Sequence, residues 1–345
     1  MRNLASFVSV MMIFLASVLS MAVQDVDVPS AIHNLSEKQV TWNSTNFFPG
    51  FYYDFDSDFG TENLNFRLTD IDQSKSRATL SDEPDMDGNR GVVYTSEAQH
   101  TSFGFGPWGE YEELGFLGGD YFAGYDSDIT DSMNDTQQQV PFLYDKSESR
   151  NLMANEQISE LLLDDDTEQT FNSSKPLELE EGYKLAIKNI DADGKKVHVE
   201  LSKNGQVVDS KVVVPSIENA DANGGTYYYK KDLGDTKGII TIAVHFKSAF
   251  HNTDNNVATV DEIFQISDTP ISLKADQKYG MMSFREVNPT TWTIKMDNKD
   301  NKIILSKNKD ISLMGKIHIK TADQDDISVD NPLRYYIYSN ESCEC

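Results

Sequence analysis

The sequence predicts an all-β protein made of two linked β-sandwich domains. From Lys184 onward apolar and polar residues alternate along many short segments, which is the pattern of strands with one buried face. Asp-Gly at 193–194 and Asn-Gly at 204–205 separate such segments, and these dipeptides accept the positive φ angles of tight hairpin turns. Helical spacing occurs at residues 158–162, but this stretch is short and runs directly into three aspartates. An all-β fold therefore explains the pattern best.

The clearest series of strands lies in residues 171–268. Apolar alternation or β-branched and aromatic runs place strands at 185–187, 197–201, 207–214, 227–229, 239–246 and 263–266. Short turns join them into a meander, and about a hundred residues of this pattern are typical of one β-sandwich. We assign this region to the second sandwich.

The flanking regions show the same pattern less regularly. Strands are expected at 51–55, 64–68, 92–95, 100–105 and 111–125 in the first sandwich region, residues 39–170. Residues 269–338 add candidates at 292–296, 303–305 and 317–319. About seventy residues bury too little surface for a separate sandwich. We therefore expect these C-terminal strands to complete the first sandwich, with residues 339–345 as a tail.

The N-terminus predicts export. Arg2 is followed by an apolar run from Leu4 to Leu19, and small residues precede the polar sequence that starts after Ala22. This run is shorter than the roughly 20 apolar residues of a membrane-spanning helix. Residues 1–22 are therefore interpreted as a cleaved signal peptide, and no membrane-spanning segment is expected in the mature chain.

Sequons and cysteines fit an exported chain. Five sites match the N-glycosylation pattern Asn-x-Ser/Thr: Asn34, Asn43, Asn134, Asn172 and Asn340. The only cysteines are Cys343 and Cys345, and a bridge between them would close too small a loop to constrain a core. A reduced tail, a crosslink between chains and a metal contact are the alternatives for this pair.

The charge and the missing motifs exclude several classes of protein. Asp and Glu number 56 against 30 Lys and Arg, so the formal net charge is −26 and the surface repels phosphate groups. We expect no nucleic-acid partner. Neither Gly-x-Ser-x-Gly nor His-Glu-x-x-His occurs, and the spacing of the six histidines suggests no metal site. We predict no enzyme activity, no catalytic residue and no bound cofactor.

Two segments are candidates for binding. Asp54, Asp56 and Asp58 would share one face of an extended strand, where their carboxylates could hold a divalent cation, and the alternative is a solvated turn. The second segment is 103–125, where aromatic residues including Trp108 stand among glycines. These rings could stack on sugars or fill a core at places where the backbone packs closely.

Taken in order, several short segments resemble the S-layer family duplication domain of methanogenic archaea. They are 48–54 (FPGFYYD), 115–125 (GFLGGDYFAGY), 161–166 (LLLDDD), 179–183 (LEEGY), 263–268 (IFQISD), 279–281 (YGM) and 311–315 (ISLMG). The resemblance spans residues 39–336. It implies two linked β-sandwiches, export to the cell surface, glycosylation, and a place among other S-layer subunits in a porous acidic lattice, with no enzyme activity.

This chain also departs from the family pattern. The family's major lattice proteins carry the domain in tandem, followed by an acidic stalk and a C-terminal membrane helix, whereas this sequence has one copy and ends at Cys345. The resemblance therefore leaves the mode of anchoring open. Besides a lattice subunit, a secreted or surface-associated module that binds glycans or other envelope proteins remains an alternative.

Overall fold

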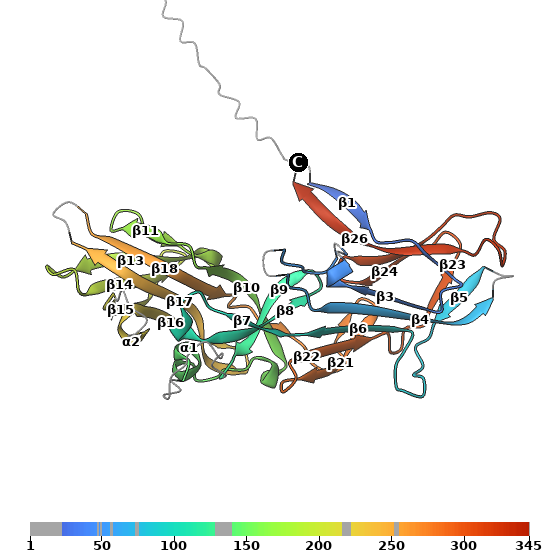
Figure 1. Ribbon diagram of the computed structural model, residues 1–345, viewed down its shortest axis with the longest axis horizontal. Coiled ribbons are helices and arrows are strands. Elements are labelled where there is room, and N and C mark those ends of the chain that lie inside the picture. The colour runs from blue at the N-terminus through green and yellow to red at the C-terminus, as the bar shows by residue number, and fades with distance from the viewer. Residues whose placement is uncertain are drawn as a thin grey trace, which may run out of the picture.

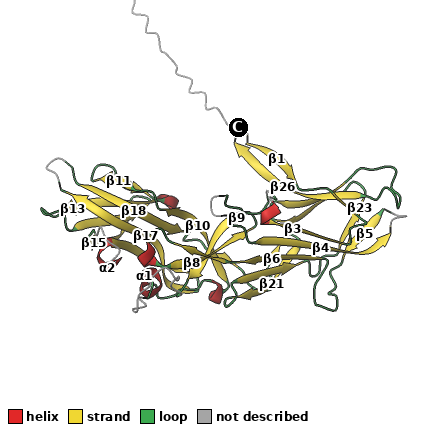
Figure 2. Ribbon diagram, in the orientation of Figure 1, coloured by secondary structure: helices red, strands yellow, loops and turns green. Residues whose placement is uncertain are grey.

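The computed structural model describes residues 23–46, 48, 50–55, 58–72, 76–127, 140–215, 222–251 and 255–344. Strands dominate this part of the chain, and the strand pairs of its four sheets are antiparallel, so the all-β prediction is confirmed (Figure 2). The molecule is elongated, with a sandwich toward each end and strands β7 to β10 near the middle (Figure 1). The predicted signal peptide lies outside the described residues.

The first sandwich consists of an eight-stranded and a five-stranded sheet. The larger sheet contains β3 (Gln39–Asn43), β4 (Glu62–Asp72), β5 (Arg77–Leu80), β6 (Val92–Glu97), β20 (Lys278–Tyr279), β21 (Met282–Asn288), β22 (Thr293–Asp297) and β23 (Ile303–Ser306). The smaller one contains β1 (Val23–Pro29), β2 (His33–Asn34), β24 (Asp310–Met314), β25 (Ile317–Thr321) and β26 (Arg334–Glu344). Their inner faces share one core, where the rings of Phe66 and Tyr335 stack at 6.4 Å.

Strands from the two ends of the sequence pair directly in this sandwich. β22 pairs with β6, so that Met296 lies opposite Tyr94, and β23 pairs with β5. The C-terminal residues were expected to form a tail, but they continue β26 as far as Glu344, paired with β1. Backbone pairing with β1 satisfies hydrogen-bonding groups that a tail would leave to solvent.

The second sandwich packs a four-stranded sheet against part of a nine-stranded sheet. The four strands are β12 (Leu177–Glu178), β13 (Tyr183–Ile190), β14 (Val197–Lys203) and β15 (Gln206–Val213). Opposite them lie β11 (Gln169–Asn172), β16 (Thr226–Leu233), β17 (Thr236–Phe250) and β18 (Val257–Ile266). The apolar residues of β14 are fully buried, as their alternation predicts. The hairpin between β14 and β15 turns at Asn204 and Gly205, with φ of 50° and 82°.

The nine-stranded sheet also contains the strands between the two sandwiches. Its order is β16-β17-β18-β10-β9-β8-β7, with β11 beside β18 and β19 (Ile271–Ser272) beside β10. The middle strands are β7 (Gln99–Ser102), β8 (Glu110–Phe116), β9 (Gly119–Tyr125) and β10 (Gln157–Asp165). These four strands fall within the predicted first sandwich region, residues 39–170, yet they join the sheet of the second sandwich. The stretch with helical spacing is strand β10, because β9 and β18 supply backbone partners on its two edges.

Helices are short in the described residues. The α-helices are α1 (Phe142–Lys146) and α2 (Ala222–Gly225), and the 3₁₀ turns are η1 (Ser44–Asn46), η3 (Gly106–Trp108), η4 (Met153–Asn155) and η5 (Glu180–Gly182). None of the helices in the described part of the chain has the length and apolar character needed to cross a membrane.

Candidate functional site

The middle of the molecule buries acidic side chains. All seven residues of β8 are buried, although the strand reads Glu-Tyr-Glu-Glu-Leu-Gly-Phe. Because alternate side chains point to opposite faces of a sheet, burial of the whole strand means that both faces of β8 are covered. Glu110, Glu112 and Glu113 are only 6%, 1% and 6% exposed. Buried carboxyl groups need hydrogen-bonding partners, and the neighbouring strands supply them.

The first of these buried acidic side chains, on the side of the first sandwich, is Glu62 on β4. It is fully buried, and its Oε2 accepts a hydrogen bond of 2.6 Å from the backbone N–H of Tyr52. The Tyr94 hydroxyl donates to Oε1 at 2.8 Å. Burial raises the pKa of Glu62 from 4.5 to about 7, although these hydrogen bonds oppose the shift. A side chain at Gly115 would bring its Cβ within 2.9 Å of Glu62 Oε2, so glycine leaves room for the carboxyl group.

The group continues through β9 and β8. The side chain of Tyr52 hydrogen-bonds to Asp120, and Asp120 in turn bonds to Glu113. Burial, together with the negative charge of Glu113, raises the pKa of Asp120 to about 8. The raised pKa favours the protonated form of Asp120 beside Glu113, so the pair can share one proton.

On the side of the second sandwich the group ends at β18. The Tyr111 hydroxyl donates to Asp164 Oδ2 at 2.7 Å, and Asp164 contacts Glu262. Glu262 Oε2 also accepts a 2.8 Å hydrogen bond from the backbone N–H of Phe105. Burial, with the charge of Asp164 beside it, raises the pKa of Glu262 to about 8. Carboxyl and tyrosine groups thus lie in contact from β4 in one sandwich to β18 in the other.

This arrangement suits a structural joint. Protonated carboxyl groups and tyrosine hydroxyls can both donate and accept, so the members can hydrogen-bond to one another without a compensating cation. Tyr111 is 1% exposed, and the pKa of its hydroxyl is raised by burial and by the charges of Asp164 and Glu113, so it stays a hydrogen-bond donor. We define Tyr52, Glu62, Tyr94, Tyr111, Glu113, Asp120, Asp164 and Glu262 as the junction group.

The metal site predicted at Asp54, Asp56 and Asp58 assumed an extended strand. The structure instead has a tight turn here, because Asp54 and Phe59 exchange backbone hydrogen bonds of 2.9 and 3.0 Å. Asp58 adopts a left-handed φ of 55°, and its carboxylate accepts a hydrogen bond from the Tyr53 hydroxyl. Asp56 lies outside the described residues. The alternation of a strand therefore does not apply to this segment, and binding of a cation there stays a prediction.

The aromatic residues among glycines form a core. Phe103, Trp108, Tyr111, Phe122 and Tyr125 are each at most 3% exposed, and they pack with residues of β17 and β18. The indole N–H of Trp108 donates to the Thr226 hydroxyl at 2.9 Å, which satisfies its one polar group in the interior. Since the Trp108 ring is buried, it is not available to stack on a sugar.

Four of the predicted sequons lie in described residues, and Asn134 lies outside them. Asn34, Asn43 and Asn172 are partly exposed and are the last residues of β2, β3 and β11, and Asn340 lies within β26. Asn172 Oδ1 accepts hydrogen bonds of 2.9 Å from the backbone N–H groups of Ser174 and Lys175. Glycosylation of these sites stays a prediction. Cys343 lies in the part of β26 that pairs with β1, and Cys345 is outside the described residues.

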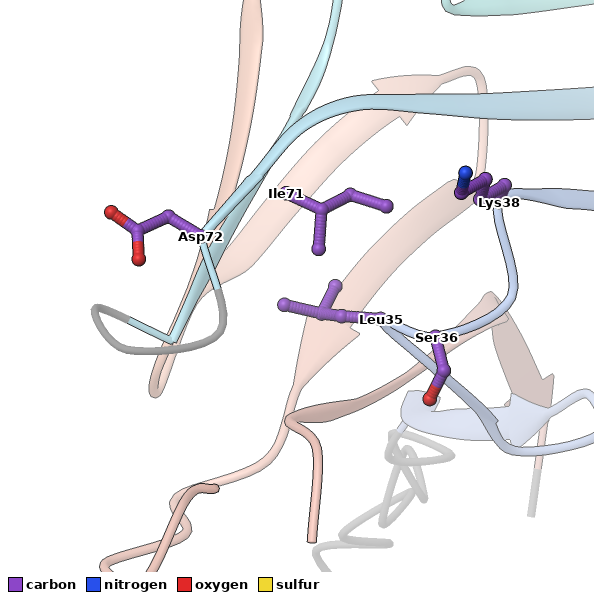
Figure 3. A pocket seen from close by; sticks show the side chains of 5 residues that line it. All are labelled: Leu35, Ser36, Lys38, Ile71 and Asp72. Atoms are coloured by element: carbon purple, nitrogen blue, oxygen red, sulfur yellow. The ribbon is translucent and has the colours of Figure 1, made fainter. Parts of the chain in front are cut away.

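An open pocket lies on the first sandwich, between the end of β4 and the segment that joins β2 to β3. It is lined by Leu35, Ser36, Lys38, Ile71 and Asp72 (Figure 3). The side chains of Leu35 and Ile71 face each other, whereas the Asp72 carboxylate points away from them. The polar groups therefore do not converge on one point, as they would in a site built for a specific small molecule.

Comparison with known proteins identifies the family. The S-layer protein family matches residues 32–323, which include strands of both sandwiches and the junction group. The chain belongs to the S-layer protein family. This agrees with the resemblance seen in the sequence, and it supports a structural component of the S-layer at the cell surface.

Similar proteins are found in methanogens. The chain is 25% identical over 308 residues to a major S-layer protein of Methanosarcina acetivorans, and 23% identical over 316 residues to that of Methanosarcina mazei. These matches cover 86% and 90% of this chain but 38% and 40% of the relatives. A major S-layer protein of Methanosarcina barkeri matches similarly, at 23% identity over 309 residues. This S-layer family chain thus spans about two fifths of the length of the curated relatives that it matches.

Proposed function

We propose that the chain is a non-enzymatic structural subunit of an archaeal surface layer, where it forms or decorates a porous acidic lattice with other S-layer subunits. The observation that carries this proposal is the family match over residues 32–323, which includes strands of both sandwiches rather than one isolated domain. The major S-layer proteins of three Methanosarcina species also match over most of this chain.

The arrangement of the sheets supports a building-block role. The nine-stranded sheet runs from the second sandwich into the middle strands, and Leu114, Phe116 and Ala123 of those strands pack into the core of the first sandwich. A lattice subunit must keep the angle between its domains constant, because neighbouring subunits repeat it. Shared cores and the buried junction group restrict that angle far more than a flexible linker would.

Assembly tests the proposal. The purified protein is mixed with S-layer subunits solubilised from its own cells. It is expected to enter regular sheets or rings that are visible by negative-stain electron microscopy. A chain that stays monomeric at high concentration, and that does not enter sheets formed by other subunits, would contradict the structural role. That result would favour a surface-associated module that binds glycans or other envelope proteins.

The acidic composition leads to a proposal for solute passage. With a formal net charge of −26, pores bordered by this chain would repel anions over a Debye length of about 8 Å at physiological salt. Isolated sheets are expected to pass a cationic probe faster than an anionic probe of the same size at low salt. The difference should vanish at high salt, where charges are screened. Equal passage of both probes at low salt would contradict this part of the proposal.

Export and glycosylation complete the proposed role. Cleavage after residue 22 would leave a mature chain beginning at Val23, where β1 begins. Glycans at Asn34, Asn43, Asn134, Asn172 or Asn340 would add hydrophilic bulk to the faces of the sandwiches. Peptide mass spectrometry of the protein from native envelopes tests both points, through the mass of the N-terminal peptide and of each sequon peptide.

A further inference from the structure

A histidine and two carboxylates converge on one face of strands β7, β8 and β9. His100 on β7 lies directly opposite Glu112 on β8. Asp126 follows the last residue of β9, and its backbone N–H donates to the Glu110 carbonyl of β8 at 3.0 Å. Cross-strand neighbours and residues two positions apart share a face of a sheet, so the three side chains meet on the same side.

The spacing of their polar atoms is compatible with a shared metal ion. His100 Nδ1 lies 3.1 Å from Glu112 Oε1 and 3.0 Å from Asp126 Oδ2. One ligand atom from each of the three residues lies within 4.8 Å of the other two. Zn²⁺ binds imidazole nitrogen and carboxylate oxygen at about 2.0–2.2 Å, so its ligand atoms lie roughly 3 to 3.5 Å apart. The two distances from Nδ1 fall in that range.

The burial of the two carboxylate oxygens also favours a bound cation. The side chains of Glu112 and Asp126 are 1% and 13% exposed, and the two oxygen atoms that face His100 are sequestered from solvent. His100 Nδ1 lies at almost the same distance from both of these carboxylate oxygens. One ion could therefore take a ligand atom from each of the three side chains at once.

We propose that His100, Glu112 and Asp126 form a binding site for a divalent transition-metal ion, with Zn²⁺ as the preferred ion. The imidazole ligand argues against Ca²⁺ and Mg²⁺, which prefer oxygen ligands throughout. His100 is 59% exposed, so water would complete the coordination on the solvent side. The ion would link β7, an edge strand of the nine-stranded sheet, to β8 and to the end of β9. These strands lie near the middle of the molecule (Figure 1).

Calorimetric titration of the chelator-treated protein with ZnCl₂ tests the site. Wild-type protein is expected to bind one Zn²⁺ at this site, and His100→Gln should weaken its affinity at least tenfold. His318→Gln is the matched control, because His318 Nδ1 also lies near a carboxylate, 3.4 Å from Asp310 Oδ1, but outside this group. Because His100 is mostly exposed, its replacement should leave the circular dichroism spectrum unchanged. Asp126→Asn provides a second variant with nearly the same volume.

Zn K-edge X-ray absorption adds a readout that distinguishes this site from the many surface carboxylates. Scattering from an imidazole ligand is expected in the wild type and in His318→Gln, and it should be lost in His100→Gln. Equal Zn²⁺ affinity of the wild type and His100→Gln, or absence of imidazole scattering in the wild type, would overturn the proposal. Either result would mean that the three residues form only an ion pair. Neither result depends on whether the protein assembles into a lattice.

Discussion

Replacing Glu62 by glutamine should make the protein more stable at alkaline pH. The pKa of Glu62 is raised from 4.5 to about 7 because the side chain is fully buried. The folded protein therefore binds this proton more tightly than the unfolded chain does, and this group's contribution to stability falls as pH rises from about 4.5 through 7. At ~1.4 kcal/mol for each pKa unit, ionisation of Glu62 costs about 3 kcal/mol of stability above pH 7.

Glutamine resembles the protonated form. It can turn its carbonyl oxygen toward the Tyr52 N–H and donate from its amide to the Tyr94 oxygen, so both contacts persist in a neutral side chain. Glu62→Gln should therefore match the wild type near pH 5 and exceed its free energy of unfolding by up to about 3 kcal/mol at pH 8.

Urea unfolding at pH 5, 6, 7 and 8, followed by circular dichroism, measures this difference. The control is Glu178→Gln, at an exposed glutamate of β12 whose carboxylate pairs with Lys184 on the surface. The control should follow the wild type across the range. The reasoning would be refuted if the difference in free energy of unfolding between Glu62→Gln and the wild type stayed constant from pH 5 to pH 8. It would also be refuted if the variant were less stable than the wild type at pH 8.

Two further predictions concern the aromatic core and the loss of stability at acidic pH. Trp108→Ala should lower the free energy of unfolding by about 3–5 kcal/mol, since it empties a fully buried site and leaves Thr226 without its indole donor. Urea unfolding tests this, and a loss below about 1 kcal/mol would contradict a core role. Partial burial by itself would raise the pKa of Asp268, but hydrogen bonds from Lys203, Lys231 and Tyr183 lower it below its usual range. Asp268 therefore stabilises the fold above pH 4, and this contribution is lost as pH falls toward the lowered pKa. Asp268→Asn should flatten the loss of stability between pH 4 and pH 2, and an unchanged slope would count against these contacts.

The strands could be predicted from the sequence where one sheet face is buried. Val197, Val199 and Leu201 alternate with polar residues, and the Asn-Gly turn after β14 fixes the hairpin register, so local pattern and tertiary structure agree. At β10 the residues of 157–165 have helical spacing over too few positions to decide, and the sheet neighbours determine the outcome.

The junction group and the histidine site could not be predicted in the same way. Acidic residues such as Glu112 and Glu113 are normally exposed, and nothing local in β8 reveals that both its faces are covered. One signal was available for the histidine site: strands β7 and β8 follow each other closely, and an antiparallel register places His100 opposite Glu112. The third ligand, Asp126, is brought in by β9, so the group becomes visible only once three strands are paired.

The central claim is that the chain is a structural part of a cell-surface layer. The most direct measurement is quantitative mass spectrometry of washed cell envelopes after labelling of intact cells with a membrane-impermeant reagent. The account predicts that this chain carries the surface label and is enriched in the S-layer fraction in a fixed ratio to the most abundant envelope protein. Recovery of the chain without label inside the cell, or only from the growth medium, would contradict it.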